Sequence, residues 1–493
     1  MATTGLVACE SGSAGGSGGG GHMKSATAIT KVYGEGQKFI AVAVEYDTEI
    51  DTSALSPSSF KVEGRTVARV YANTAAATAD QGTNGTYVIV ELSPDDDSAL
   101  LWGISGPYGN GGGGGNGGGN ASAKPSASQP QPQPQPQSKS SSSSSAAQPT
   151  QSSGTPGVVP GPTLGATGGA ANIKKAQATV IQTGTVTTTG GSTYAADSAA
   201  KVTTSRTVNP VVDDFKQFTF QDPKTGKSLP YNLYIPKGYD KDDKDDKSGK
   251  SGTAKSYPLV LFMHDASVVS TTVKATLVQG LGAVCWAGPE DQAVREAFVL
   301  APQYPSVVVS DDYKPTAYFD ATANLVEELT SRYRIDADRL YSTGQSMGAM
   351  MTLGLNIKYP DLFAASFVVA GQWPAAQAAP LAKKNLWITV SEGDTKAYPG
   401  ENAITKVIEQ AGTKVARATW NGRSTAAQFA TDVEELEAKG TTVNYSAFLK
   451  GTTLTATQAA QNPNALEHNS TWPIAYTIED IREWIFKQRR VKR

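Results

Sequence analysis

Residues 341–351 read Tyr-Ser-Thr-Gly-Gln-Ser-Met-Gly-Ala-Met-Met and contain the pattern G-x-S-x-G, with Ser346 at its centre. Between a strand and a helix this pattern is a nucleophile elbow, a sharp turn that presents the serine hydroxyl at the end of the strand. Gly344 and Gly348 suit a turn whose crowded backbones leave no room for a Cβ. A glycine-rich turn with an incidental serine is the alternative interpretation.

The flanking sequence has the strand-turn-helix context that the motif requires. Residues 339–343 are short and fairly apolar, as in a buried parallel strand, and residues 349–359 predict a helix that ends before Pro360. The run at 257–263 is continuously apolar, as strands covered on both faces are. Further strands are predicted at 298–302, 365–369 and 386–390, and further helices at 321–332 and 478–487. We therefore expect a doubly wound α/β sheet in residues 212–493.

The N-terminal part has a different pattern. Short apolar stretches between polar turns predict one small β-sandwich over residues 24–210, and two separate β modules are the alternative. The expected strands are 39–46, 60–62, 67–71, 87–92 and 178–183. Residues 109–160 are Gly-Asn, Gln-Pro and Ser repeats. Because such repeats cannot bury enough apolar surface to offset their chain entropy, we expect a disordered insert within the sandwich.

Residues 1–23 predict a leader and tether. Leu-Val-Ala-Cys at 6–9, followed by a glycine-rich stretch, resembles the lipobox of bacterial lipoproteins. A lipidated Cys9 would attach the protein to a membrane, which predicts an extracellular or cell-surface location. A chance match is the alternative, because the basic and apolar regions of a signal peptide do not precede the cysteine.

Composition excludes several classes of protein. The chain has 493 residues and a net charge of −2, so no basic surface argues for nucleic-acid binding. Two cysteines cannot form a disulfide framework, and the fold must depend on burial. The sequence contains no run of 18 apolar residues, so it predicts no membrane-spanning helix.

A serine nucleophile needs a general base, and histidine is the usual one. The chain has three histidines, at positions 22, 264 and 468. His22 lies in the tether, and His264 directly follows an apolar strand upstream of the nucleophile, where a structural role under the adjoining loop is expected. The order serine, acid, histidine that is typical of α/β-hydrolases selects His468, which precedes the last predicted helix. An ordinary loop histidine is the alternative.

The acid should follow a later strand. Asp394 stands in Ser-Glu-Gly-Asp after the strand at 386–390, and the preceding glycine allows a tight turn there. Its expected role is to set the tautomer of the base and to stabilise the imidazolium. Glu392, Glu401 and Asp432 are the alternatives.

The oxyanion of an acyl-transfer reaction needs two backbone N–H donors. One is expected from Met347, the residue after the nucleophile. The other is expected from the loop after the strand at 257–263, from Asp265 or Ala266.

Five segments together carry a family resemblance: 259–265, 298–303, 344–348, 391–394 and 468–472. They resemble α/β-hydrolase esterases related to feruloyl esterases and polyhydroxybutyrate depolymerases, in the branch with an N-terminal immunoglobulin-like domain that is often labelled as predicted peptidases. The resemblance covers about residues 212–493 well and the β-rich part loosely. It implies an immunoglobulin-like sandwich ahead of the hydrolase domain.

The resemblance also implies a Ser346, Asp394 and His468 triad. The family usually has His-Gly where this chain has His264-Asp265, so we expect a different oxyanion-loop conformation, since aspartate adopts positive φ less easily than glycine. The segment between the acid and the base looks long and is expected to shape the substrate cleft.

These observations predict a serine carboxylic-ester hydrolase that needs no metal and no organic cofactor. The expected substrate is a small-molecule or polymeric ester of short-chain, feruloyl or polyester type. A serine peptidase of the same fold is one alternative, and a surface binding protein with a relic hydrolase domain is another. Candidates for contacting substrate are Gln345, Trp286, Trp373, Trp420 and Trp472. The β-domain is a candidate for forming homo-oligomers.

Overall fold

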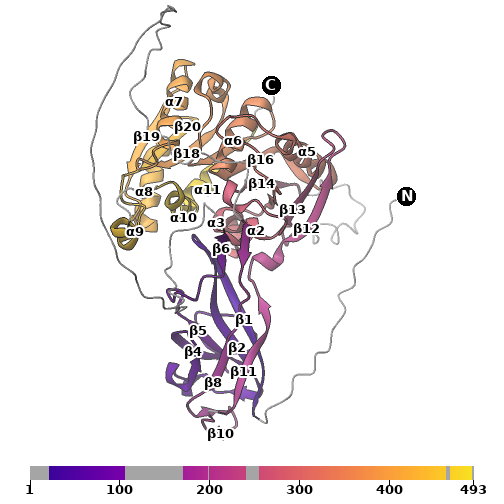
Figure 1. Cartoon of the computed structure of the whole chain (residues 1–493), viewed down its shortest axis with the longest axis vertical. Helices are drawn as coiled ribbons and strands as arrows, with labels where there is room; N and C mark the ends of the chain where they lie inside the picture. Colours follow the sequence, from indigo (N-terminus) through magenta and orange to yellow (C-terminus); the bar gives the residue numbers. More distant parts are fainter. Residues whose placement is uncertain (1–20, 106–169, 198, 240–254, 462–466, 491–493) are drawn as a thin grey trace, which may run out of the picture. The chain divides into compact units, whose positions relative to one another are not determined.

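The computed structural model of the protein describes residues 21–105, 170–197, 199–239, 255–461 and 467–490. Cys9 and the insert expected at 109–160 lie outside these residues. No helix of the described part combines the length and the apolar character needed to cross a membrane. The described residues form two main β-sheets, an N-terminal one from strands within residues 23–208 and a C-terminal one from strands within residues 216–448 (Figure 1).

The N-terminal sheet has seven strands in the order β3-β8-β11-β1-β2-β5-β4. Its strands are β1 (Met23–Tyr33), β2 (Gly36–Ile50), β3 (Phe60–Val62), β4 (Val67–Asn73), β5 (Gly85–Leu92), β8 (Thr179–Gln182) and β11 (Lys201–Val208). Two small pairs accompany it: β6 (Trp102–Ser105) with β7 (Ala170–Ile173), and β9 (Val186–Thr187) with β10 (Thr193–Tyr194). All five strands predicted from the sequence of this region are confirmed.

This sheet curls around an apolar core. Its edge strands β3 and β4 are neighbours in sequence, joined only by residues 63–66, so the two edges must approach one another. Alternate residues of β2, among them Val42 and Val44, point into that core. The intervening Ala41 and Ala43 belong to a smaller cluster on the opposite face. Because successive side chains of a strand point to opposite faces, both faces of β2 are covered.

The C-terminal sheet has nine strands in the order β12-β13-β15-β14-β16-β17-β18-β20-β19. The strands are β12 (Lys216–Gln221), β13 (Ser228–Tyr234), β14 (Tyr257–Met263), β15 (Phe298–Pro302), β16 (Ile335–Gln345), β17 (Ala365–Val369), β18 (Leu386–Ser391), β19 (Val415–Trp420) and β20 (Val443–Phe448). The pairings from β15 to β19 are parallel, whereas β12 and β13 pair antiparallel. The predicted α/β sheet is confirmed, with two antiparallel strands added at one edge.

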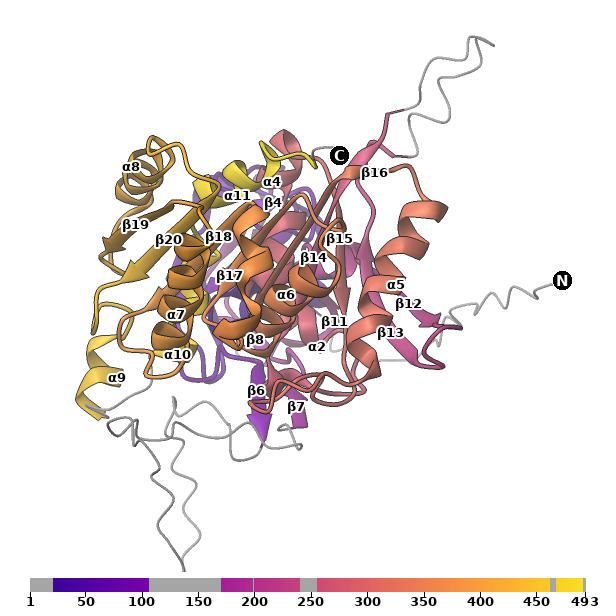
Figure 2. The same ribbon diagram turned by 90° about the horizontal axis from the view of Figure 1, so that it is seen from above.

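Helices cover both faces of this sheet (Figure 2). The helices are α2 (Ala275–Val278), α3 (Leu281–Val284), α4 (Pro289–Val294), α5 (Ala317–Arg332), α6 (Met347–Lys358), α7 (Ala397–Gln410), α8 (Ala426–Glu437), α9 (Ala456–Gln461), α10 (His468–Ala475) and α11 (Glu479–Phe486). Leu259 and Leu261 of β14 pack in the core that includes α5, α6 and α7. Val260 and Phe262, between them, pack in the core that includes α8 and α11. The continuous apolar run of this strand therefore serves two cores at once.

The segment between Asp394 and His468 is long because it contains α7, β19, α8 and β20. Its two strands complete the sheet. Its helices were hard to recognise because each buries only one stripe of residues and exposes many polar ones. The edge strand β19 is likewise only partly buried, which weakens its apolar pattern.

Candidate active site

Ser346 occupies a strained turn between β16 and α6. Its φ of 51° and ψ of −116° lie in a region that side chains with a Cβ rarely adopt. The backbone is held there because the Ser346 N–H donates to the carbonyl of Val369 in β17 and its carbonyl accepts from Met350 in α6. Strain of this kind, stabilised by its surroundings, is typical of functional positions and of nucleophile elbows.

The two glycines of the motif are required by close backbone contacts. A Cβ on Gly348 would lie 1.9 Å from the carbonyl oxygen of Met263, at the end of β14. A Cβ on Gly344 would lie 2.4 Å from the backbone of Gly348. Neither obstacle is a side chain that could rotate away, so α6 can pack against β14 and β16 only with glycine at both positions.

Gly348→Ala is expected to lower the free energy of unfolding by about 3 kcal/mol or more, because the backbone must shift to admit the methyl group. Urea denaturation of the variant measures the loss. Gly288→Ala is the matched control, since a Cβ there meets its nearest neighbour at 3.5 Å and φ is −59°. Equal stability of the two variants would contradict the packing argument.

Ser346, His468 and Asp394 form one chain of hydrogen bonds. The Nε2 atom of His468 lies 2.9 Å from the Oγ of Ser346, and its Nδ1 is hydrogen-bonded to the Oδ2 of Asp394. These side chains come from the turn after β16, from the first residue of α10 and from the loop after β18. His468 precedes the last helix, α11, as expected, and it is itself the first residue of α10.

Asp394 is oriented by the start of α7. Its Oδ1 accepts the backbone N–H groups of Lys396 at 3.0 Å and Ala397 at 2.8 Å, which leaves Oδ2 facing His468. The alternative carboxylates are placed elsewhere. Glu392 accepts from the backbone of Lys450, and Asp432 lies on α8.

The charges of the pair are mutually stabilised. Burial lowers the pKa of His468, but the Asp394 carboxylate outweighs this effect and holds the pKa above its ordinary value. Asp265 acts in the same direction, and Lys396 acts against it. Burial raises the pKa of Asp394, but His468 and the two backbone N–H groups outweigh it and hold that pKa below its ordinary value. The Asp394 carboxylate and a protonated His468 therefore stabilise one another.

The two expected oxyanion donors belong to the start of α6 and to the segment after β14. Met347 is the first residue of α6, and its thioether sulfur accepts from the backbone N–H of Val308. Asp265 follows β14 and precedes a short 3-10 helix that begins at Ala266. Asp265 has a φ of −74°, a backbone conformation that does not need glycine.

Gln345 holds this loop to the elbow. Its amide donates to the Oδ2 of Asp265 and to the Oε1 of Gln279, both at 3.0 Å. The other oxygen of Asp265 accepts the backbone N–H of Ser267. The Gln345 amide is thus occupied within the protein, which corrects the expectation that it contacts substrate. Sequence reasoning missed Gln279, because a partner 66 residues away leaves no local signal.

His264 is fully buried beneath the loop. Its Nε2 accepts the backbone N–H of Tyr304 at 2.9 Å, and its Nδ1 lies 2.7 Å from the carbonyl of Asp265. These partners require a neutral imidazole with its proton on Nδ1. Burial also lowers the pKa of His264. The expected structural role is confirmed.

Most of the tryptophans expected at the cleft are core residues. Trp286 is 1% exposed and Trp420 3%, and both pack in the core on the α8 and α11 side. Trp373 packs against Phe319 and Tyr313 and donates to Gln377. Because their surfaces are covered by protein, the expectation for these three is corrected. Trp472 contacts the base, edge to face, at 5.4 Å between ring centroids.

Glu401 was an alternative acid, and the structure gives it a different place. It is fully buried in α7, and its Oε1 accepts the backbone N–H of Gly371 at 2.9 Å. Its Oε2 and the hydroxyl of Tyr445 have no partner among the described residues. Burial raises the pKa of Glu401 well above its ordinary value, although the Gly371 N–H acts against this. A neutral carboxyl is expected there.

Glu401→Gln is expected to stabilise the protein at neutral and higher pH. A raised folded pKa means that the stabilising protonated form is fully present below the unfolded pKa and is lost as pH rises through the folded pKa. Glutamine keeps an oxygen that accepts from Gly371, and it does not lose stability as pH rises. Thermal unfolding at pH 4 and pH 8 measures the stability of the variant relative to the wild type, with the exposed Glu434→Gln as control. A wild-type advantage at pH 8 would contradict the assignment.

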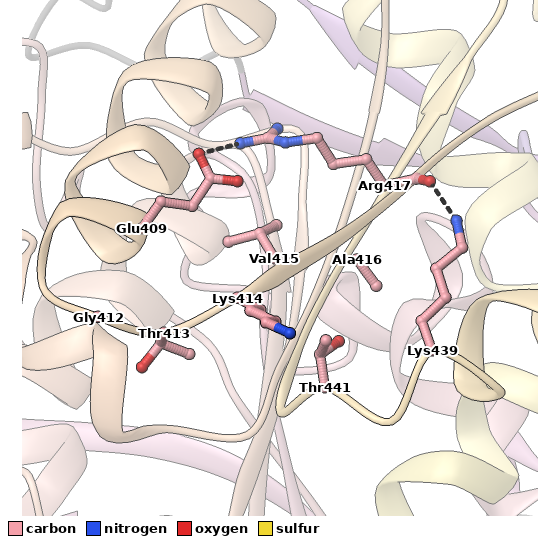
Figure 3. Close-up of a pocket in the computed structure, with 9 residues that line it drawn as sticks. All are labelled: Glu409, Gly412, Thr413, Lys414, Val415, Ala416, Arg417, Lys439 and Thr441. Carbon is pink, nitrogen blue, oxygen red and sulfur yellow. Dashed lines mark hydrogen bonds and ion pairs between the residues drawn. The ribbon is translucent and has the colours of Figure 1, made fainter.

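A surface pocket of about 530 Å3 lies beside the edge strand β19, lined by charged residues that include Lys414, Arg417 and Lys439 (Figure 3). It opens where β19 and β20 begin, whereas Ser346 and Asp394 follow the carboxyl ends of their strands. In a parallel sheet the amino ends and the carboxyl ends of the strands lie on opposite sides of the sheet. This pocket therefore does not belong to the site. Within the described ranges, no three His, Cys, Asp or Glu side chains gather to hold a metal ion.

Residues 25–195 match the model of the esterase Ig-like N-terminal domain. The chain is also 44% identical over 87 residues to the protein NocK from Nocardia uniformis subsp. tsuyamanensis, which is 18% of this chain and 24% of that protein. It is 32% identical over 97 residues to acetylxylan esterase A from Emericella nidulans, 16% of this chain and 32% of the relative. The chain thus matches about a quarter to a third of the length of these curated relatives.

The crystal structure of a thermostable esterase is similar over 95% of this chain and 100% of its own, with a TM-score of 0.66 and 24% identity. At this identity the comparison establishes the fold. The chain therefore combines a region at residues 25–195 that matches the esterase Ig-like N-terminal domain with an α/β-hydrolase fold.

Proposed function

We propose that the protein is a serine carboxylic-ester hydrolase, with Ser346 as nucleophile, His468 as general base and Asp394 as the residue that orients the base. One observation carries the proposal: His468 lies between the other two, with Nε2 at 2.9 Å from the serine Oγ and Nδ1 on the carboxylate. The esterase type of the N-terminal domain supports it independently.

The reaction proceeds in two halves. Ser346 attacks the ester carbonyl while its proton passes to Nε2 of His468, and the imidazolium then protonates the departing alcohol. In the second half a water molecule loses its proton to the same nitrogen and attacks the acyl-enzyme, which releases the carboxylic acid and restores the serine. Asp394 stays ionised throughout, which agrees with its lowered pKa.

The negative charge of each tetrahedral intermediate is stabilised by backbone N–H groups. Met347 supplies one donor from the start of α6, where the helix dipole adds to it. The second donor is Asp265 or Ala266, in the loop that Gln345 fastens to the elbow. Each such donor contributes about 3 kcal/mol to lowering the barrier.

Short acyl esters are the substrates that we propose first, because acetylxylan esterase A is among the relatives that match part of the chain. The test is hydrolysis of p-nitrophenyl esters from acetate to dodecanoate, of methyl ferulate and of acetylated xylan. Turnover that declines with acyl length supports the proposal. Preference for p-nitroanilide peptides would identify a peptidase instead, and no turnover of any substrate would refute the hydrolase.

A further inference from the structure

Glu467, the residue before the base, is a buried carboxylate with three hydrogen-bond donors. It is 3% exposed, and its Oε2 accepts from the hydroxyls of Ser391 at 2.5 Å and Thr453 at 3.1 Å. Its Oε1 accepts the backbone N–H of Gly451 at 2.8 Å. A carboxylate is costly to bury, and donors of this number and geometry offset that cost.

These donors belong to two segments, the end of β18, which leads to the acid, and the turn after β20. Ser391 ends β18 and stands three residues before Asp394, and Gly451 and Thr453 follow β20. The approach to the acid loop is close, because a Cβ on Gly393 would lie 2.1 Å from Oε1 of Glu467. One side chain therefore connects the loop that carries the acid, the turn after β20 and the start of α10.

The backbone of Glu467 is also held by hydrogen bonds. Its carbonyl accepts from the hydroxyls of Thr471 at 2.8 Å and Ser470 at 3.2 Å, within the first turn of α10. The hydroxyl of Ser470 also lies 2.8 Å from that of Thr453. His468 follows directly, so the same contacts determine where its imidazole stands.

We propose that Glu467 is a positioning residue, which holds His468 in register with Asp394 by binding both the acid loop and the turn after β20. This inference rests on the proposed function, since it concerns the same base. The hydrogen bonds of Glu467 go to Ser391, Gly451, Thr453, Ser470 and Thr471, and none of them goes to Ser346. Its effect on turnover passes through the geometry of the pair formed by the imidazole and the Asp394 carboxylate.

Two substitutions separate geometry from charge. In Glu467→Gln the amide oxygen can still accept from Gly451, and the NH2 group can donate to the hydroxyl oxygens of Ser391 and Thr453, which rotate to suit. Glu467→Ala removes all three contacts. Glu392→Ala is the matched control, because this carboxylate joins the same loop to Lys450 without reaching α10.

Glu467→Ala is expected to lower kcat by about tenfold to a hundredfold with KM within about threefold, since misplacing a catalytic group by about 1 Å has effects of this size. Glu467→Gln is expected to retain kcat within about threefold and Glu392→Ala within about twofold, on the same argument. In Glu467→Ala, Asp394 should stabilise the imidazolium of His468 less, which lowers the pKa of His468, while Asp265 and Lys396 act on it as before. The pH at which kcat/KM falls on the acidic side should therefore be lower in Glu467→Ala and unchanged in the other two variants.

A readout independent of turnover keeps this proposal separate from the proposed function. The His468 Nδ1 proton, shared with Asp394, should give a low-field proton resonance in the wild type and in Glu467→Gln, and this resonance should be lost in Glu467→Ala. An unchanged resonance and kcat in Glu467→Ala would overturn the positioning role. If the alanine variant does not fold, Thr453→Val takes its place, and a wild-type resonance and kcat there would overturn the role equally. Wild-type protein that shows the resonance but hydrolyses no ester would refute only the proposed function.

Discussion

Replacing Ser346 by alanine is expected to lower kcat for p-nitrophenyl acetate by about 10^5-fold to 10^6-fold, the size of effect that removal of a triad serine produces. The variant should fold, because the hydroxyl faces His468 and the strained backbone at this position is held by contacts of the main chain. The residual rate would come from substrate binding and the oxyanion donors alone. Steady-state kinetics and labelling by a fluorophosphonate, which modifies the activated serine covalently, both measure the effect.

Ser342→Ala is the matched control for this experiment. Ser342 lies four residues earlier, in β16, and its hydroxyl pairs with that of Ser366, which keeps a second partner in Asn356. Its loss should leave both kcat and labelling near the wild-type level. Ester turnover that survives in Ser346→Ala, or labelling that persists there, would assign the nucleophile to another residue.

Asp394→Asn is expected to lower kcat at neutral pH by about ten-thousandfold while the fold is retained. The asparagine oxygen can still accept the N–H groups of Lys396 and Ala397, but its NH2 group would face the Nδ1 of His468. The imidazole must then present an unprotonated Nδ1 and carry its proton on Nε2, so it cannot take the proton of Ser346. The wrong tautomer, and not a lost contact, is the cause of the inactivity.

The same substitution should change the pH dependence. The base works only when neutral, so kcat/KM falls as pH drops through the pKa of His468, which Asp394 holds above its ordinary value. Without the carboxylate that pKa falls, and the acidic limb of the remaining activity moves to lower pH. Asp432→Asn, on α8, is the control and should keep the wild-type profile. An Asp394→Asn enzyme with more than about a tenth of wild-type activity would contradict the tautomer argument.

Most of the strands that bury both faces were predictable from the sequence, but β20 was missed because its buried Asn444 and Ser446 interrupt the apolar run. The strands at 257–263, 298–302 and 365–369 were placed with the bounds that the structure gives them, since a short and mostly apolar run marks such a strand directly. Elements that bury one face, such as α7 and β19, were missed because their polar residues hide the pattern. The order of nucleophile, acid and base along the chain was likewise readable, because it follows from how strands succeed one another in this fold.

Sequence alone therefore determined the α/β class, the β-rich N-terminal part, and the three residues proposed to carry out the reaction. Tertiary structure alone decided that Gln345 fastens the oxyanion loop, that Asp265 needs no positive φ, and that Glu467 joins three segments at the base. The physical reason is the range of the interactions. Burial and turn preferences act between near neighbours and leave a local pattern, whereas a hydrogen bond between residues 76 positions apart, as between Ser391 and Glu467, leaves none.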